Sequence, residues 1–142
     1  AMADRREYKF ALCYVDLDFL KRVNDRFGHS TGDYVLRDFS EIAQSVLREL
    51  DCVSRIGGEE FVLVLAGTSQ NDAKSAANRI GEKLSKLLVS SNEPNYRISA
   101  SMGITEFRKN EDIEETMDRA AKALYEAKRT GRNKVVIAGL DH

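Results

Sequence analysis

The chain has 142 residues, of which 42% are hydrophobic and 32% charged, a balance typical of one globular domain. Because 22 Lys and Arg residues face 23 Asp and Glu residues, the net charge of −1 argues against a polycationic nucleic-acid binder. One Pro and nine Gly argue against disorder. No apolar run approaches the roughly 20 residues of a membrane span, and no secretion leader is recognisable. We expect a single cytoplasmic domain over residues 1–142 that contacts neither nucleic acid nor membrane.

The two cysteines, Cys13 and Cys52, each lie in or beside an apolar run. A disulfide framework or a zinc site would need more cysteines, or histidines at ligand spacing. We therefore expect two reduced thiols in the core.

The chain is predicted to begin with a buried strand and a short helix. Residues 10–15 are apolar on both faces, which is typical of a central strand. A helix should follow over residues 19–27 and end at Gly28. The next helix is expected to start after a turn, with Thr31 or Asp33 as its cap.

Apolar residues at three-and-four spacing extend that second helix over residues 35–50. Residues 53–56 and 61–65 are predicted to form two strands. The segment 57–60 should join them as a hairpin, because its paired glycines allow positive φ.

The second half of the chain alternates helices and strands. Helical spacing covers residues 73–88 and 113–127, and strands are predicted over 96–104 and 135–137. The order is β-α-α-β-β-α-β-α-β. The expected fold class is α/β (α+β), with a mixed, largely antiparallel central sheet flanked by helices, of the ferredoxin-like kind.

Carboxylates gather at two predicted turns. Asp16 and Asp18 follow the buried strand, while Glu59 and Glu60 occupy the hairpin. Such groups repel one another unless a cation lies between them. A hard divalent ion such as Mg²⁺ accepts oxygen ligands together with water and phosphate. The alternative is that these are ordinary solvated turn acids.

Candidate anion-binding groups lie in two other segments. The amides of Phe19 and Leu20 open a helix, where phosphate oxygens bind readily, and Lys21 lies on the same turn. A cationic cluster near the C-terminus contains Lys128, Arg129, Arg132 and Lys134. The alternative for that cluster is simple complementarity with a helix C-terminus. Acids for metal and cations for anions together are typical of phosphoryl transfer.

Several separated motifs carry a family resemblance. They are Asp16–Asp25, Gly28–His29, Gly32–Asp33, Arg55–Phe61, Ala123–Lys128 and Gly131–Asn133, in this order. Together the motifs resemble the GGDEF family of diguanylate cyclases, in its GGEEF variant. The resemblance extends over nearly the whole chain and implies the palm-type fold of nucleotidyl cyclases.

The resemblance implies that two GTP molecules condense to cyclic di-GMP and release two pyrophosphates. Asp16, Glu59 and the Leu17 carbonyl would hold Mg²⁺ or Mn²⁺, and Glu60 would deprotonate or position the attacking hydroxyl. Because each protomer would bind one GTP, the resemblance further implies a transient homodimer in which two active sites face each other.

The resemblance also assigns the nucleotide contacts. The triphosphate would be held by the Phe19 and Leu20 amides together with Lys21, Lys128 and Arg132. Guanine would be read by Asn24 and Asp33, since a carboxylate accepts from guanine N–H groups and an amide serves its other edge.

A second site follows from the resemblance and from spacing. Arg48 and Asp51 form an Arg-x-x-Asp pattern that five residues separate from Gly57, as in the family's inhibitory product site. Arg79 is a candidate third member of this site for cyclic di-GMP. The alternative is a surface pair at a helix end.

The chain lacks the helix with which the family usually begins, so we expect a truncated catalytic domain of a longer protein. An alternative function is a non-catalytic module that binds GTP or cyclic di-GMP. The presence of Asp16, Glu59 and Glu60 disfavours it. A relative that makes another cyclic dinucleotide is disfavoured by Asp33.

Overall fold

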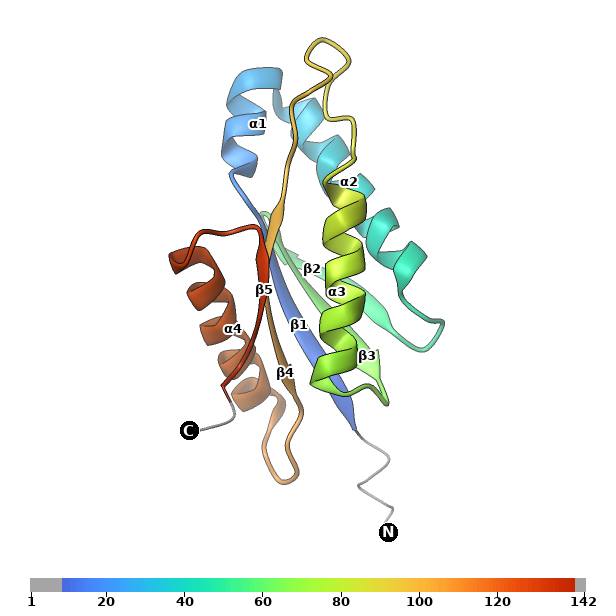
Figure 1. Ribbon diagram of the computed structural model, residues 1–142, viewed down its shortest axis with the longest axis vertical. Coiled ribbons are helices and arrows are strands. Elements are labelled where there is room, and N and C mark those ends of the chain that lie inside the picture. The colour runs from blue at the N-terminus through green and yellow to red at the C-terminus, as the bar shows by residue number, and fades with distance from the viewer. Residues whose placement is uncertain (1–8, 140–142) are drawn as a thin grey trace.

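The computed structural model describes residues 9–139 and contains one five-stranded sheet (Figure 1). The strands are β1 (Phe10–Leu17), β2 (Cys52–Gly57), β3 (Glu60–Ala66), β4 (Ala100–Glu106) and β5 (Lys134–Ile137). Their order across the sheet is β2-β3-β1-β4-β5, with β4 and β5 parallel and every other pair antiparallel. The predicted mixed, largely antiparallel sheet and the predicted order of elements are therefore confirmed.

Four helices cover the two faces of this sheet. They are α1 (Leu20–Phe27), α2 (His29–Val46), α3 (Gln70–Leu84) and α4 (Ile113–Arg129). In Figure 1, α4 lies on one side of the sheet and α2 and α3 on the other. Period-two alternation along β1 explains this, because Cys13 and Val15 join the larger core while Leu12 packs with Ala120 of α4.

Local sequence signals account for where α3 and α4 begin. The Ser69 hydroxyl accepts from the Asp72 amide at the start of α3. Asp112 and Glu115 form a reciprocal capping box at the start of α4. Within residues 9–139, no helix is long and apolar enough to cross a membrane.

The predicted cap at Thr31 or Asp33 is wrong, because α2 already begins at His29. Gly28 adopts a φ of 99°, and this conformation lets the chain turn between α1 and α2 at a single residue. Residues 29–33 are therefore the first turn of α2 and not a loop. The Thr31 hydroxyl donates to the Phe27 carbonyl.

The predicted strand at 96–104 starts late, because β1 ends at Leu17, whose register partner is Ala100. β4 is regular only from Ala100, and residues 96–99 are irregular. Ile98 and Met102 are nevertheless buried in the same core. The helix predicted to run to residue 88 ends at Leu84.

The expectation of two core thiols is half correct. Cys13 is buried, and burial raises its pKa to about 12. Cys52 is exposed because it opens β2, an edge strand whose side chains are mostly exposed.

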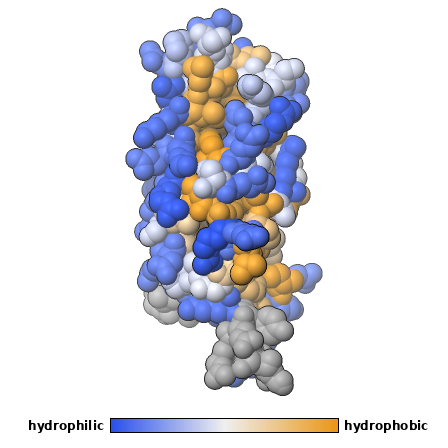
Figure 2. Space-filling model, turned by 90° about the vertical axis from the view of Figure 1, so that its right-hand side faces the viewer, coloured by the Kyte–Doolittle hydropathy of each residue, from blue (hydrophilic) through white to orange (hydrophobic). Residues whose placement is uncertain are grey.

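On the right-hand side of the molecule, Figure 2 shows an apolar band along the long axis, flanked by hydrophilic side chains.

Candidate functional site

The β2–β3 hairpin brings the predicted acidic residues to the end of the central strand. Asp16 of β1 pairs in register with Glu60, the first residue of β3. Gly57 also pairs with Glu60, which leaves Gly58 and Glu59 in the turn, where Gly58 has a positive φ. The Leu17 amide donates to the Glu59 carbonyl at 3.2 Å. Asp16 and Glu59, which the sequence placed at two separate turns, are therefore brought together at one corner.

Negative charge at this corner is only partly compensated. The Asp16 side chain is 6% exposed and forms an ion pair with Lys128, from the last turn of α4. Burial raises the pKa of Glu59, and the charge of Asp16 and a hydrogen bond with it raise that pKa further. Lys128 opposes this rise.

A divalent cation suits these donors. Two neighbouring carboxylates, one with a raised pKa, are oxygen ligands whose mutual repulsion a cation relieves. In the described part of the chain, no cluster of three or more His, Cys, Asp or Glu side chains is arranged to hold a metal. The protein therefore supplies two carboxylates here, a set that leaves further ligands to the backbone, water and phosphate.

Glu60 has a partner that the sequence did not reveal. The Tyr14 hydroxyl donates to its Oε1 at 3.1 Å. Tyr14 precedes Asp16 by two residues, so the two side chains share one face of β1. Burial raises the Tyr14 pKa, and the hydrogen bond to Glu60 raises it further. The i, i+2 spacing of Tyr14 and Asp16 could have indicated that they share a face of the strand. The sequence is equally consistent with Tyr14 as a core residue.

Asp18 is a buried anchor whose role sequence reasoning missed. Its carboxylate accepts from Ser99 and Ser101 hydroxyls, each at 2.7 Å, and from the Asn133 amide at 3.0 Å. The Arg132 guanidinium lies 3.6 Å from it. These contacts fasten the turn after α4 to the end of β1. Their partners lie more than eighty residues away in the chain, so no local pattern indicates them.

The predicted phosphate-binding residues lie around the same end of β1, but the Lys21 side chain is paired with Asp25. Phe19 is the N-cap of α1, and the Arg132 guanidinium lies 4.7 Å from its ring centroid. Leu20 is buried, which leaves its backbone for any phosphate contact. Lys21 is exposed and pairs with Asp25 at 3.3 Å, one turn further along α1.

The predicted guanine-binding residues meet where α1 joins α2. Gly32 lies so close to Asn24 that a Cβ on it would be 1.7 Å from Asn24 Oδ1. Asp33 is the next residue of α2 and is exposed. The Arg26 guanidinium ties α1 to the loop before β4 through Glu93, with contacts of 2.6–3.0 Å. Asn24 and Asp33 are thus presented at one corner.

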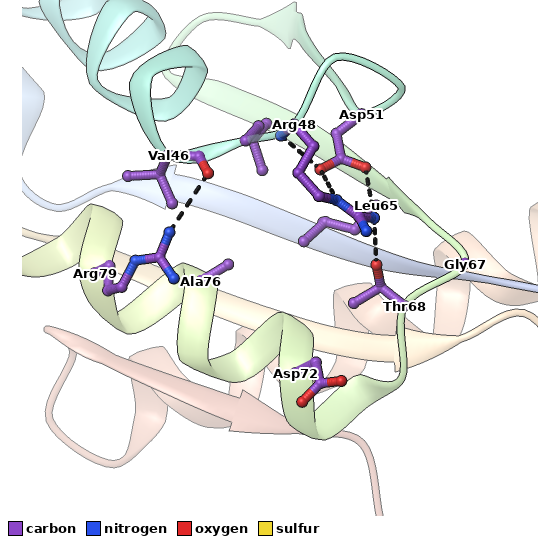
Figure 3. A pocket seen from close by; sticks show the side chains of 10 residues that line it. Val46, Arg48, Asp51, Leu65, Gly67, Thr68, Asp72, Ala76 and Arg79 are labelled. Atoms are coloured by element: carbon purple, nitrogen blue, oxygen red, sulfur yellow. Dashed lines mark hydrogen bonds and ion pairs between the residues drawn. The ribbon is translucent and has the colours of Figure 1, made fainter.

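A cavity of about 220 Å³ on another part of the fold is lined by the predicted inhibitory residues (Figure 3). Arg48 donates to both Asp51 oxygens, at 3.2 and 3.1 Å, and to the Thr68 hydroxyl at 2.7 Å. Arg79 comes from α3 and reaches the Val46 carbonyl at 3.5 Å. The structure therefore gathers all three predicted residues around one cavity.

The Asp51 carboxyl is fully satisfied. Burial by itself would raise its pKa, but hydrogen bonds from the Arg48 side chain and from the Arg48 and Ala66 amides lower it. Asp51 is 1% exposed at the side chain, whereas Arg48 is 60% exposed. A buried acceptor thus holds an accessible guanidinium in place.

A mixed sheet with helices on both faces and carboxylates at the end of its central strand defines a palm domain of the nucleotidyl-cyclase type. Residues 1–134 match the family model described as "Diguanylate cyclase, GGDEF domain". The chain belongs to the GGDEF family, whose members generally use divalent metals.

Known proteins of this family are similar in both sequence and structure. Diguanylate cyclase A of Treponema denticola is 35% identical over 131 residues, which are 90% of this chain and 35% of that protein. The active GGEEF domain of a Vibrio cholerae diguanylate cyclase is 32% identical with a TM-score of 0.90, covering 98% of this chain and 88% of that one.

The GGDEF domain of DgcB from Caulobacter crescentus, solved in complex with c-di-GMP, is also similar. It is 32% identical with a TM-score of 0.86, and the match covers 92% of this chain and 78% of that one. The chain spans about a third of the length of the curated relatives that it matches.

Proposed function

We propose that residues 1–142 are a single catalytic domain that acts as a diguanylate cyclase. It condenses two GTP molecules into cyclic di-GMP and releases two pyrophosphates. The observation that carries the proposal is the crowding of Asp16 and Glu59 at the end of β1, where Glu59 has a raised pKa. The family and its diguanylate cyclase members support the same activity.

Asp16, Glu59 and the Leu17 carbonyl are the proposed ligands of Mg²⁺ or Mn²⁺. When bound, such an ion lowers the pKa of the attacking hydroxyl and stabilises charge on the leaving group. Asp16 is buried and tied to Lys128, so its carboxylate is held in a defined position. The ion pair also keeps the charge of Lys128 beside the reacting phosphates.

Glu60 is proposed to receive the proton of the ribose 3′-hydroxyl. The 3′-oxygen then forms a bond to the α-phosphorus of the other GTP, and the bond from that phosphorus to the bridging oxygen of pyrophosphate breaks. Glu60 lies opposite Asp16 on the neighbouring strand. The Tyr14 hydroxyl bonded to its Oε1 leaves Oε2 for the proton.

Nucleotide binding is assigned to the residues around α1. The backbone amides of Phe19 and Leu20, with Lys21, Lys128 and Arg132, would hold the triphosphate, because helix-start amides and cations bind anions. Asn24 and Asp33 would read the guanine base. Their support is their common position at the α1–α2 corner.

The reaction joins two nucleotides, so the site needs a second copy of the domain that faces it. We propose a transient homodimer, bridged by the two GTP molecules. Linking two copies raises their effective concentration, so a dimerised form should be faster than the free domain.

Inhibition by the product is proposed at the cavity of Arg48, Asp51 and Arg79. The accessible guanidinium of Arg48, held in place by the buried Asp51, suits guanine and phosphate. The cavity lies on a different part of the fold from Asp16 and Glu59, so product held there would leave the acidic corner free.

The test is an assay with GTP and Mg²⁺ of the free domain and of the domain fused to a dimerising coiled coil. We expect cyclic di-GMP and pyrophosphate from the fusion, measured by mass spectrometry and a coupled pyrophosphate assay. Nucleotide binding without any product from the fusion would instead support a non-catalytic binding module and refute the enzyme.

A further inference from the structure

We propose that Arg22 is an additional binding residue for the phosphates of the nucleotide, held in place by the ring of Phe19. The inference rests on the proposed function, since it concerns the same nucleotide site. Arg22 lies within the Asp16–Asp25 motif, but neither the resemblance nor the carboxylate corner gave it a role.

The first observation is the contact itself. The guanidinium carbon of Arg22 lies 4.0 Å from the centroid of the Phe19 ring. A cation at this distance is attracted by the negative face of an aromatic ring. Arg22 and Phe19 are three residues apart, and the Arg22 amide donates to the Phe19 carbonyl at 2.9 Å. The first turn of α1 therefore orients the arginine toward the ring.

The second observation is that Phe19 also lies under Arg132. The guanidinium carbon of Arg132 is 4.7 Å from the same centroid. Because both distances share one centroid, the two guanidinium carbons are at most about 9 Å apart. At this separation one polyanion can contact both guanidinium groups. Asp18 lies 3.6 Å from Arg132 and offsets part of its charge. Oxygens of a triphosphate are suitable acceptors for two planar forks.

The third observation is that the backbone conformation at Phe19 holds its ring at the surface. Phe19 has a φ of 58°, and its side chain is exposed although it is large and apolar. Such a conformation is unfavourable for a bulky residue and persists where the surroundings impose it. Arg132 is also in the left-handed region, with a φ of 64°, and lies beside the buried carboxylate of Asp18. The backbone conformations of Phe19 and Arg132 thus fix both residues of this contact.

The fourth observation is the lack of a competing acceptor for Arg22. Other arginines of this protein, such as Arg26 and Arg119, are bound to a carboxylate at 2.6–2.7 Å. Among the contacts of residues 9–139, the guanidinium of Arg22 has neither an ion pair nor a hydrogen-bond acceptor. Stacking on a ring leaves the N–H donors of the fork available, and the same ring also lies 4.7 Å from the guanidinium carbon of Arg132.

The experiment measures binding of GTP, GDP and GMP, each with Mg²⁺, to the purified domain by calorimetry. Arg22→Ala should weaken GTP binding by roughly five- to tenfold, a loss of one charge-assisted contact, and GMP binding by less than twofold. Phe19→Leu should weaken GTP binding at least as much, because it releases both arginines. Arg22→Lys should recover part of the loss.

The matched control is Arg108→Ala. Arg108 is an exposed arginine in the turn between β4 and α4, beside the start of β1 and so at the far end of the sheet from Asp16. This variant should bind all three nucleotides as the unmodified protein does. Circular dichroism and thermal melting should show that every variant folds.

Two results would overturn the inference alone. One is GTP affinity within twofold of the unmodified protein in Arg22→Ala. The other is an equal loss for GMP and GTP, which would mean that Arg22 supports α1 rather than the outer phosphates. Failure of the unmodified protein to bind GTP at all would refute the proposed function together with the inference.

Discussion

Two corners of this molecule hold a buried aspartate, and they differ in how that charge is satisfied. At the end of β1, Asp16 shares one lysine with Glu59, whose pKa is raised. Beside α3, Asp51 accepts an arginine fork and two backbone amides, and its pKa is lowered. The first corner carries excess negative charge and suits a cation. The second is preformed and presents an arginine.

The largest effect should come from removing a charge at the first corner. Asp16→Asn and Glu59→Gln should each reduce cyclic di-GMP formation at least about a hundredfold, as expected for loss of a group that stabilises the transition state. The melting temperature of Glu59→Gln should stay equal to or rise above that of the unmodified domain, because repulsion between the two carboxylates is removed. That of Asp16→Asn should fall, because Lys128 loses its buried partner.

The control for these variants is Glu82→Gln on the exposed surface of α3. It should leave the rate unchanged. If Glu59→Gln formed cyclic di-GMP at the normal rate, the corner of Asp16 and Glu59 would not differ in function from the corner of Asp51.

At the second corner, Arg48→Ala should raise the concentration of cyclic di-GMP needed for half inhibition by about tenfold or more. The initial rate should change by less than about twofold. The free energy of unfolding should fall only slightly, because Asp51 keeps its backbone donors while losing an exposed partner. Inhibition that persists at the same product concentration would contradict the assignment.

Gly32→Ala tests the guanine corner by sterics. A Cβ there would collide with Asn24 Oδ1, so Asn24 must move. We expect the KM for GTP to rise about three- to tenfold with a smaller change in kcat, since a substrate contact is displaced. Gly81→Ala on α3 is the matched control, because nothing lies within 4 Å of its Cβ. It should stabilise the fold by about 0.5–1 kcal/mol.

A third acid extends the comparison to pH. Hydrogen bonds from Arg119 lower the pKa of Glu111 from 4.5 to about 2, so Glu111 behaves like Asp51. Its contribution to stability is present above pH 4.5 and is lost as the pH falls through about 2. Glu111→Gln should reduce the free energy of unfolding by about 1–3 kcal/mol at pH 7.

Denaturant titrations of both proteins at pH 7, 4 and 2.5 measure this difference. The difference in free energy of unfolding between the unmodified protein and Glu111→Gln should decrease as the pH falls across that series. A gap that stays constant with pH would show that Glu111 acts by packing and not by charge.

The smallest effect concerns the thiols. In the native domain a thiol reagent should react quickly at the exposed Cys52, while the buried Cys13 with its raised pKa stays protected. Both should react after denaturation. Equal reactivity of the two thiols in the native protein would contradict the position of Cys52 on the edge strand.

Much of the fold follows from short-range pattern. The apolar run that became β1, the paired glycines of the hairpin and the three-and-four spacing of α3 and α4 all predicted the observed elements. The wrong predictions concern the ends of helices and strands, which depend on the backbone at single residues. Gly28 at positive φ moved the start of α2 to His29, and the end of β1 at Leu17 shortened β4.

The sequence by itself determined which chemical groups are present: acids at a strand end and a hairpin, cations after the last helix, and an Arg-x-x-Asp pair. The spacing along the chain by itself left Asp16 and the hairpin acids at two separate turns, since only the family resemblance implied that they share one site. It could not place Asp18 on Ser99, Ser101 and Asn133, nor Arg132 over Phe19.

Only the tertiary structure decided those contacts. They join segments some 80 to 115 residues apart, and the meeting of such segments depends on how every intervening element packs. The same packing decides how charge is shared, since the pKa of Glu59 rises and that of Asp51 falls according to neighbours that the chain order does not reveal.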